Sequence, residues 1–247
     1  MTTSDASHRL SPRLEMLMSK VFSRAGAVAC AVLLTAAPAF AQQTLNFSFG
    51  YFILHGEDAR VPGDVLVANQ SFLAFDFGEF NGPSVGGEWL IPIGRFVEGG
   101  AGVSFTRQTV PSVYADFVDS DGSEIFQELR LRRVPMDFTV RLLPLGQTSP
   151  VQPYVGIGAT AIAWRYSEFG EFVDFDAGRQ IFRGEFVASG TQAGLVALGG
   201  VRFAGPSASA GFEIKYHRAD APLDSRFAGP RIDLGGWTYQ VTGGLRF

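Results

Sequence analysis

The chain has 247 residues, with 20 basic and 24 acidic side chains, so its net charge is −4 at pH 7 with neutral histidines. This balance argues against a nucleic acid as partner, because such a surface needs an excess of Lys and Arg. The single cysteine, Cys30, excludes an intramolecular disulfide.

Residues 1–41 have the pattern of a cleaved signal peptide. Lys20 and Arg24 form a short basic region, and a mostly apolar run from Ala25 to Ala37 follows. The run is shorter than the roughly 20 residues that a membrane-spanning helix needs. Signal peptidase accepts small residues at the first and third positions before the cut, so we predict cleavage between Ala41 and Gln42. The predicted cleavage site comprises Ala39, Ala41 and Gln42.

Two alternatives concern this leader. Translation could start at Met16 or Met18, since the polar stretch before them is long for a signal peptide. A lipidated Cys30 would make a lipoprotein, but few apolar residues precede it, which favours cleavage after Ala41. Removal of residues 1–41 leaves 206 residues with a net charge of −6 and no cysteine.

The remaining chain alternates apolar and polar residues with period two, which predicts an all-β fold. Phe138 and Val140, for example, alternate with Asp137 and Thr139. We predict an antiparallel up-and-down transmembrane β-barrel of about eight strands, with short periplasmic turns and four long extracellular loops. The expected strands are residues 45–55, 84–93, 97–110, 129–143, 153–166, 191–203, 209–218 and 236–247.

Three features leave the details of the strands open. The alternation slips near Arg132-Arg133, which indicates a β-bulge or the membrane edge. Residues 65–68 and 72–77 fit strand extensions or a fifth hairpin, which would give ten strands. Residues 116–126 resemble residues 171–182, which fits two short hairpins or two segments that pack together as a cap.

Four motifs carry a resemblance to a known family. Residues 45–247 resemble the small outer-membrane β-barrels of the OmpA-like and OmpW-like type. The resemblance implies an outer-membrane location, contact with outer-membrane lipid and lipopolysaccharide, insertion by the outer-membrane assembly machinery, and a monomer. An aromatic end of the last strand resembles the signal that this machinery reads; its residues are Trp237, Tyr239 and Phe247. The motifs are Gly86-Gly87-Glu88-Trp89, residues 152–158, residues 199–203 and residues 243–247.

No pattern in the sequence predicts catalysis or a cofactor. His55 and His217 lie near outer strand ends, where we expect rim histidines, and no spacing selects a serine partner for either. Residues 119–124 superficially resemble a calcium loop but lack its distal bidentate glutamate, so a solvated acidic loop is the better interpretation. We therefore expect no enzyme, no cofactor and no metal.

The polar face of the strands carries many charges. An eight-stranded barrel has an interior that side chains just fill, and a charge there needs a partner. We predict an ionic ladder that plugs the lumen, with Glu213 and Lys215 in cross-strand reach of Arg246 or Arg202. The predicted network comprises Glu88, Glu98, Arg133, Asp137, Arg141, Arg202, Glu213, Lys215 and Arg246.

Two classes of function fit this barrel. The first is a structural or surface-interaction barrel with a plugged lumen, and the second is a transport barrel for small or hydrophobic solutes. Charge pairing in the lumen favours the first, whereas a continuous apolar groove beneath the loops would favour the second. An outer-membrane enzyme is a third and weaker alternative.

Overall fold

The computed structural model describes residues 43–174 and 178–247. The predicted signal peptide and its cleavage site lie outside the described residues, so the cleavage stays a prediction. None of the helices in the described residues has the length and hydropathy needed to cross a membrane.

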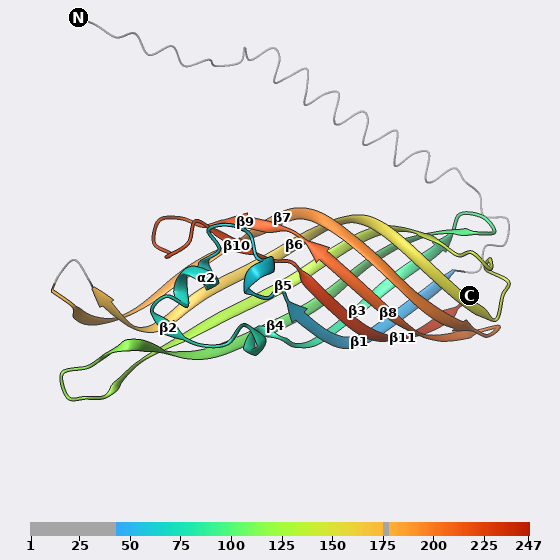
Figure 1. The fold of residues 1–247 in the computed structure, drawn as a ribbon. Helices are drawn as coiled ribbons and strands as arrows, with labels where there is room; N and C mark the ends of the chain where they lie inside the picture. Colours follow the sequence, from blue (N-terminus) through green and yellow to red (C-terminus); the bar gives the residue numbers. More distant parts are fainter. Residues whose placement is uncertain (1–42, 175–177) are drawn as a thin grey trace, which may run out of the picture. The chain divides into compact units, whose positions relative to one another are not determined.

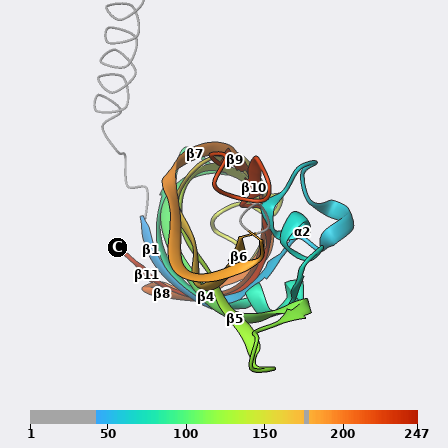
Figure 2. The same ribbon diagram turned by 90° about the vertical axis from the view of Figure 1, so that its left-hand side faces the viewer.

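Eight antiparallel strands form one closed ring (Figures 1 and 2). The order around the ring is β4-β3-β1-β11-β8-β7-β6-β5, and pairing of β4 with β5 closes it. The predicted barrel of eight strands is confirmed, and the ten-strand alternative is wrong. The ring strands are β1 (Thr44–Leu54), β3 (Gly82–Pro92), β4 (Val97–Val118), β5 (Glu124–Leu142), β6 (Val151–Asp174), β7 (Gln180–Ala204), β8 (Ala208–Arg218) and β11 (Gly236–Arg246).

Four of the strands are much longer than predicted. β4, β5, β6 and β7 have 22, 19, 24 and 25 residues, whereas the other four have 11 each. The segments expected as loops at residues 111–127 and 167–190 are therefore mostly two paired hairpins that extend the wall toward the left in Figure 1. The described parts of the similar segments 116–126 and 171–182 lie in these hairpins, and the guanidinium group of Arg179 lies 5.3 Å from the ring centre of Phe117.

The predicted slip at Arg132-Arg133 is not a bulge. Register between β4 and β5 is the same on both sides of this pair, and the only shift lies between Val113 and Val118 of β4 in the described residues. Arg130 and Arg132 both lie on the outer face. The outer face therefore changes from apolar to charged residues while the alternation continues, as expected at a membrane edge.

The first and last long loops cover the loop end of the barrel. The first contains 3-10 helices at Glu57–Ala59 and Phe77–Phe80, the α-helix α2 (Val65–Asn69) and the strand β2 (Leu73–Ala74), which pairs with β4. The last contains the paired strands β9 (Asp220–Pro222) and β10 (Arg231–Asp233).

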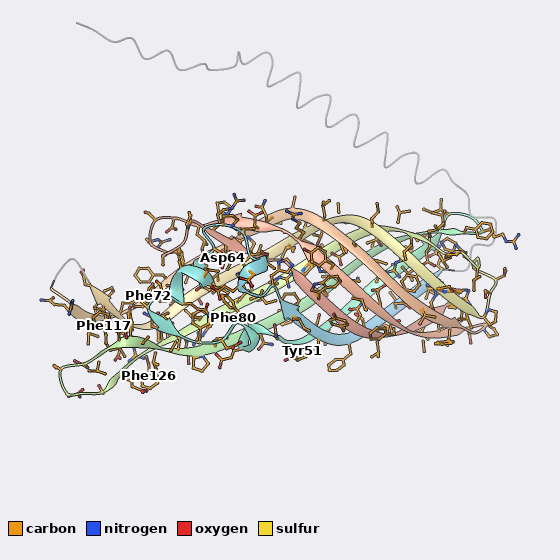
Figure 3. The ribbon with its side chains drawn as sticks, in the orientation of Figure 1. Tyr51, Asp64, Phe72, Phe80, Phe117 and Phe126 are labelled. Atoms are coloured by element: carbon orange, nitrogen blue, oxygen red, sulfur yellow. The ribbon has the colours of Figure 1, made fainter. Side chains whose placement is uncertain are left out.

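Local chemistry explains α2, where a strand extension or fifth hairpin was predicted. The carboxylate of Asp64 accepts hydrogen bonds from the backbone N–H groups of Leu66 and Val67, which is an N-cap. Val65 and Leu66 are fully buried, so the short helix is held by packing rather than by its length. Figure 3 shows Asp64 and Phe80 on this covering segment, and Tyr51 projecting away from the wall.

The interior has two regions of opposite chemistry. The part nearest the short turns holds the ionic lumen, defined here as Glu88, Glu98, Asp137, Arg141, Arg202, Glu213, Lys215 and His217, all buried. The loop end holds the apolar core, a cluster that includes Leu66, Phe80, Leu129, Ile162 and Ile232, each 0–1% exposed.

Candidate functional site

The centre of the ionic lumen is Arg141 of β5. Its guanidinium group forms an ion pair with Glu88 of β3 and a second, at 3.0 Å, with Glu213 of β8. All three side chains are on the inner faces of their strands, and β8 is not a neighbour of β5 in the ring. These pairs therefore cross the lumen and fill it, instead of running along one sheet face.

The two carboxylates of this cluster have further partners. Tyr154 donates its hydroxyl to Glu213 at 3.0 Å, and the amide of Gln240 donates to the other oxygen at 2.7 Å. Lys215 lies 3.6 Å from Glu213 and 3.9 Å from Glu88. Every charge of this cluster thus has an ion-pair partner, which buried charges require, since an unpaired buried charge is strongly destabilising.

A second cluster forms around Asp137 on the loop side of the first. Lys215 lies 3.4 Å from this carboxylate, His217 bonds it through Nε2 at 3.0 Å, and Thr160 donates its hydroxyl to it at 2.7 Å. Lys215 thereby links the two clusters into one continuous network.

The turn end of the lumen has a separate pair. Arg202 of β7 and Glu98 of β4 lie 2.8 Å apart across the lumen, and Arg202 also donates Nε–H to the amide oxygen of Gln152. Seven of the nine predicted network residues are thus in ion pairs.

The other two, Arg133 and Arg246, have different partners. Arg133 stacks over the ring of Phe52 at 4.0 Å, and Arg246 donates to the carbonyl oxygen of Gly205 at 2.6 Å. Neither has a carboxylate within ion-pair distance among the described residues. The predicted pairing of Glu213 and Lys215 with Arg246 or Arg202 is therefore wrong, because the acceptors of these arginines come from across the lumen and from a turn.

Both histidines are buried rather than on the rim, which corrects the prediction. His217 has the same inward parity as Glu213 and Lys215 on β8, a signal that the sequence already contained. His55 bonds Asp233 through Nδ1 at 3.1 Å. Within the described parts of the chain neither ring is hydrogen-bonded to a serine hydroxyl.

The two covering loops are joined by a buried ionic latch. Arg60 donates to both oxygens of Asp64, at 2.7 and 2.9 Å, and to the backbone carbonyl of Asp233 at 3.2 Å. The N–H of Asp233 donates to Asp64 at 2.6 Å. Burial raises the pKa of Asp233, but hydrogen bonds from His55 and the Gly235 N–H outweigh it, so the pKa lies below its ordinary value.

A third polar cluster lies within the apolar core beneath α2. Tyr166 and Asn69 both donate to Glu168 Oε1, at 2.8 and 2.7 Å. Burial raises the pKa of Glu168, and these two hydrogen bonds only partly oppose the shift. Burial and the nearby Glu168 charge also raise the pKa of Tyr166 well above its ordinary value.

The arrangement gives little support to metal or nucleophilic chemistry. Among residues 43–174 and 178–247, no group of three or more His, Cys, Asp and Glu side chains has the placement to hold a metal ion. The sequence did not single out Gln152, Tyr154, Thr160 or Gln240, although each has the inward parity of its strand.

Comparisons with known proteins give a structural likeness. No family model and no curated protein sequence matches the chain. The structure is similar to Ail of Yersinia pestis (12% identity, TM-score 0.41, 84% of this chain and 99% of that one). It is similar to Neisserial surface protein A (12%, 0.45, 83% and 97%) and to outer membrane protein W of E. coli (13%, 0.39, 85% and 100%).

Proposed function

We propose that this chain is an integral outer-membrane barrel with a plugged lumen, which acts as a structural or surface-interaction protein and not as an enzyme. The support for a membrane location is the outer face of the wall. On β5 the outward residues from Val134 to Leu142 are all apolar, and Phe138 is 63% exposed. Nine residues span about 26 Å along a strand and about 20 Å along the axis of a barrel whose strands tilt by about 40°.

Aromatic side chains lie at the loop side of this apolar belt. Tyr51 pairs directly with Tyr239, and the rings of Tyr216 and Trp237 are 4.7 Å apart on neighbouring strands. All four point outward. Tyrosine and tryptophan favour the boundary between hydrocarbon and water, where one end of the ring is apolar and the other polar.

The observation that carries the proposed plug is the continuity of the ion pairs across the lumen. Arg202 and Glu98 fill the turn end, Arg141 the middle, and Asp137 the loop side. The apolar core and the ionic latch lie beyond them. An ion would have to break several charge pairs and pass packed hydrocarbon, so we infer that the barrel conducts little.

The transport alternative has less support. It needs a continuous apolar groove beneath the loops, but Leu66, Phe80 and Ile232 there are packed to at most 1% exposure. The enzyme alternative needs a nucleophile with an activating base. His55 and His217 each bond a carboxylate, but among the described residues neither ring is hydrogen-bonded to a hydroxyl that could act as the nucleophile.

Planar-bilayer recording of refolded protein tests the proposal. We expect the wild-type barrel to insert, shown by heat-modifiable migration and protection of its strands from protease, and to give almost no steady current. Steady ion current from the intact barrel would reject the plug and support transport. Failure to enter bilayers would reject the membrane location itself.

A further inference from the structure

Three arginines stand side by side on the outer wall. Arg107 of β4 is directly paired with Arg132 of β5, and Arg132 is directly paired with Arg165 of β6. All three side chains point outward and are exposed. Directly paired residues have their β-carbons about 5 Å apart, so three positive charges share one short stretch of wall.

The position of this arginine row on the wall is specific. Along each strand toward the loop end, the row directly follows the last apolar outward residue of the belt. These residues are Phe105, Val134 and Ala163. Beyond the row the next two outward residues of β5, Arg130 and Glu128, are both charged. The arginine row therefore marks the level at which the proposed hydrocarbon region ends.

The row lacks partners of its own. Arg130 is ion-paired with Glu128, but among the described residues no carboxylate lies within ion-pair distance of Arg107, Arg132 or Arg165. The three arginines line one open surface pocket of about 240 Å³ together with Arg130, Leu131, Ser167 and Glu185. Like charges directly opposite in a sheet are destabilising, so the wall gains stability if an anion binds between them.

We propose that this row binds the phosphate groups of a phosphorylated lipid in the leaflet at the loop end, with the acyl chains lying on the apolar belt below. The inference rests on the proposed membrane location. A guanidinium group binds phosphate oxygens through two parallel hydrogen bonds, and three neighbouring guanidinium groups can form several such bidentate pairs. A lipid fits better than a free anion because the arginine row directly adjoins the exposed Phe105 and the apolar wall below it.

The test uses the barrel in phosphatidylcholine nanodiscs that contain lipid A with both phosphates, or lipid A without phosphates. Native mass spectrometry counts the lipid A retained on each barrel. We expect retention of the phosphorylated form only. The triple variant Arg107→Gln/Arg132→Gln/Arg165→Gln should bind it about 100-fold more weakly, because each arginine near a charged membrane surface contributes about fivefold.

A matched variant separates the site from net charge. Arg95→Gln/Arg179→Gln/Arg226→Gln removes three exposed positive charges that lie in turns, away from the loop-side edge of the belt, and should retain lipid A as the wild type does. Thermal unfolding adds an independent readout. Without lipid A the triple variant of the row should be at least as stable as the wild type, whereas added phosphorylated lipid A should stabilise only the wild type and the matched variant.

Each other outcome overturns the proposal. Equal retention by the row variant, equal retention of lipid A without phosphates, or equal loss in the matched variant would reject a phosphate site at the row. Full competition by inorganic phosphate at an equal phosphate concentration would leave a free-anion site and reject the lipid. A barrel that does not enter nanodiscs would refute the proposed function, whereas a barrel that enters but retains no lipid A would refute only this site.

Discussion

The ionic lumen and the apolar core are built by the same strands with opposite chemistry. On β5, Asp137 and Arg141 face inward where Phe138 and Val140 face outward. Nearer the loop end, Leu129 faces inward where the neighbouring Arg130 faces outward. Inward and outward parity never changes along the strand. What changes is the chemistry of both faces. Where the outer face is apolar the inner face carries charges, and where the outer face carries charges the inner face is apolar.

The two regions should therefore be stabilised in different ways. The ionic lumen is stabilised by a few ion pairs. Removal of one member of a pair leaves the other as an unpaired buried charge. The apolar core is held by many small packing contacts, so a truncation there costs according to the hydrocarbon lost and the cavity left. Each kind of stabilisation can be tested by making the same substitution at a buried and at an exposed position.

The largest effect is expected at Glu213. Glu213→Ala leaves Arg141 and Lys215 with one carboxylate fewer and removes the acceptor of Tyr154 and Gln240. If the lumen is dry, the free energy of unfolding should fall by about 3–5 kcal/mol. Urea unfolding of the barrel in lipid vesicles measures the change.

Glu128→Ala is the control for that variant. Glu128 pairs with Arg130 on the outer face, where both side chains are partly exposed. Loss of this pair should cost only about 0–1 kcal/mol. A Glu213→Ala barrel that lost no more than the control would indicate a water-filled lumen.

The second expected effect compares two leucines of β5. Leu129 is fully buried in the apolar core, whereas Leu142 is 50% exposed on the outer belt. Leu129→Ala should cost about 2–5 kcal/mol, because it leaves a cavity. Leu142→Ala removes the same atoms without a cavity and should cost clearly less. Equal losses at the two positions would contradict a packed core beneath the loops.

Much of this architecture could be predicted from the sequence, because parity is a local property. The alternation on residues 129–143 located a strand and its inward charges without knowledge of its neighbours. The pairs across the lumen could not be predicted, since Arg141 meets Glu213 through closure of the ring. The change of chemistry at Arg132-Arg133 was visible but ambiguous, because a bulge and a membrane edge both interrupt an apolar face.

The covering loop was predicted less well than the strands. Residues 65–68 are apolar and β-branched enough to suggest a strand. The N-cap at Asp64 and the buried contacts of Leu66 select a short helix instead. Tertiary packing determines the helical conformation of this segment, and that packing cannot be recognised from the local sequence.

A third prediction concerns the pH dependence of the apolar core. The pKa of Glu168 is raised in the folded barrel, so between its ordinary and raised values the folded state holds a proton that the unfolded state has released. Stability should therefore fall as pH rises through that window. Glu168→Gln removes the ionisable group and keeps an oxygen that Tyr166 and Asn69 can donate to, so its stability should decline less with pH.

Urea midpoints measured from about pH 4 to about pH 8 give the two slopes. Glu185→Gln, an exposed position on the outer face of β7, is the control and should keep the wild-type slope. Identical slopes for wild type and Glu168→Gln would show that Glu168 does not hold its proton in the folded barrel.

The smallest effect on stability is expected at the end of the chain. Phe247 is 68% exposed, and its recorded hydrogen bonds, with Gln43, use only the backbone. Phe203 also points outward at the turn end and is 57% exposed. A carboxylate at either position should cost at most about 1 kcal/mol near the membrane boundary. Phe247→Asp and Phe203→Asp should therefore refold in vitro with similar stability.

In cells the two variants should differ. If Phe247 is the residue that the assembly machinery reads, Phe247→Asp should be secreted normally but reach the outer membrane at a severalfold lower yield, whereas Phe203→Asp should assemble like the wild type. Heat-modifiable migration of membrane fractions measures assembled barrel, and periplasmic protein measures secretion. Equal membrane yields would reject the terminal signal without affecting the proposed lumen plug, because both phenylalanine side chains are exposed and neither belongs to the ionic network. Equal loss in both variants would assign the defect to the carboxylate on the lipid face.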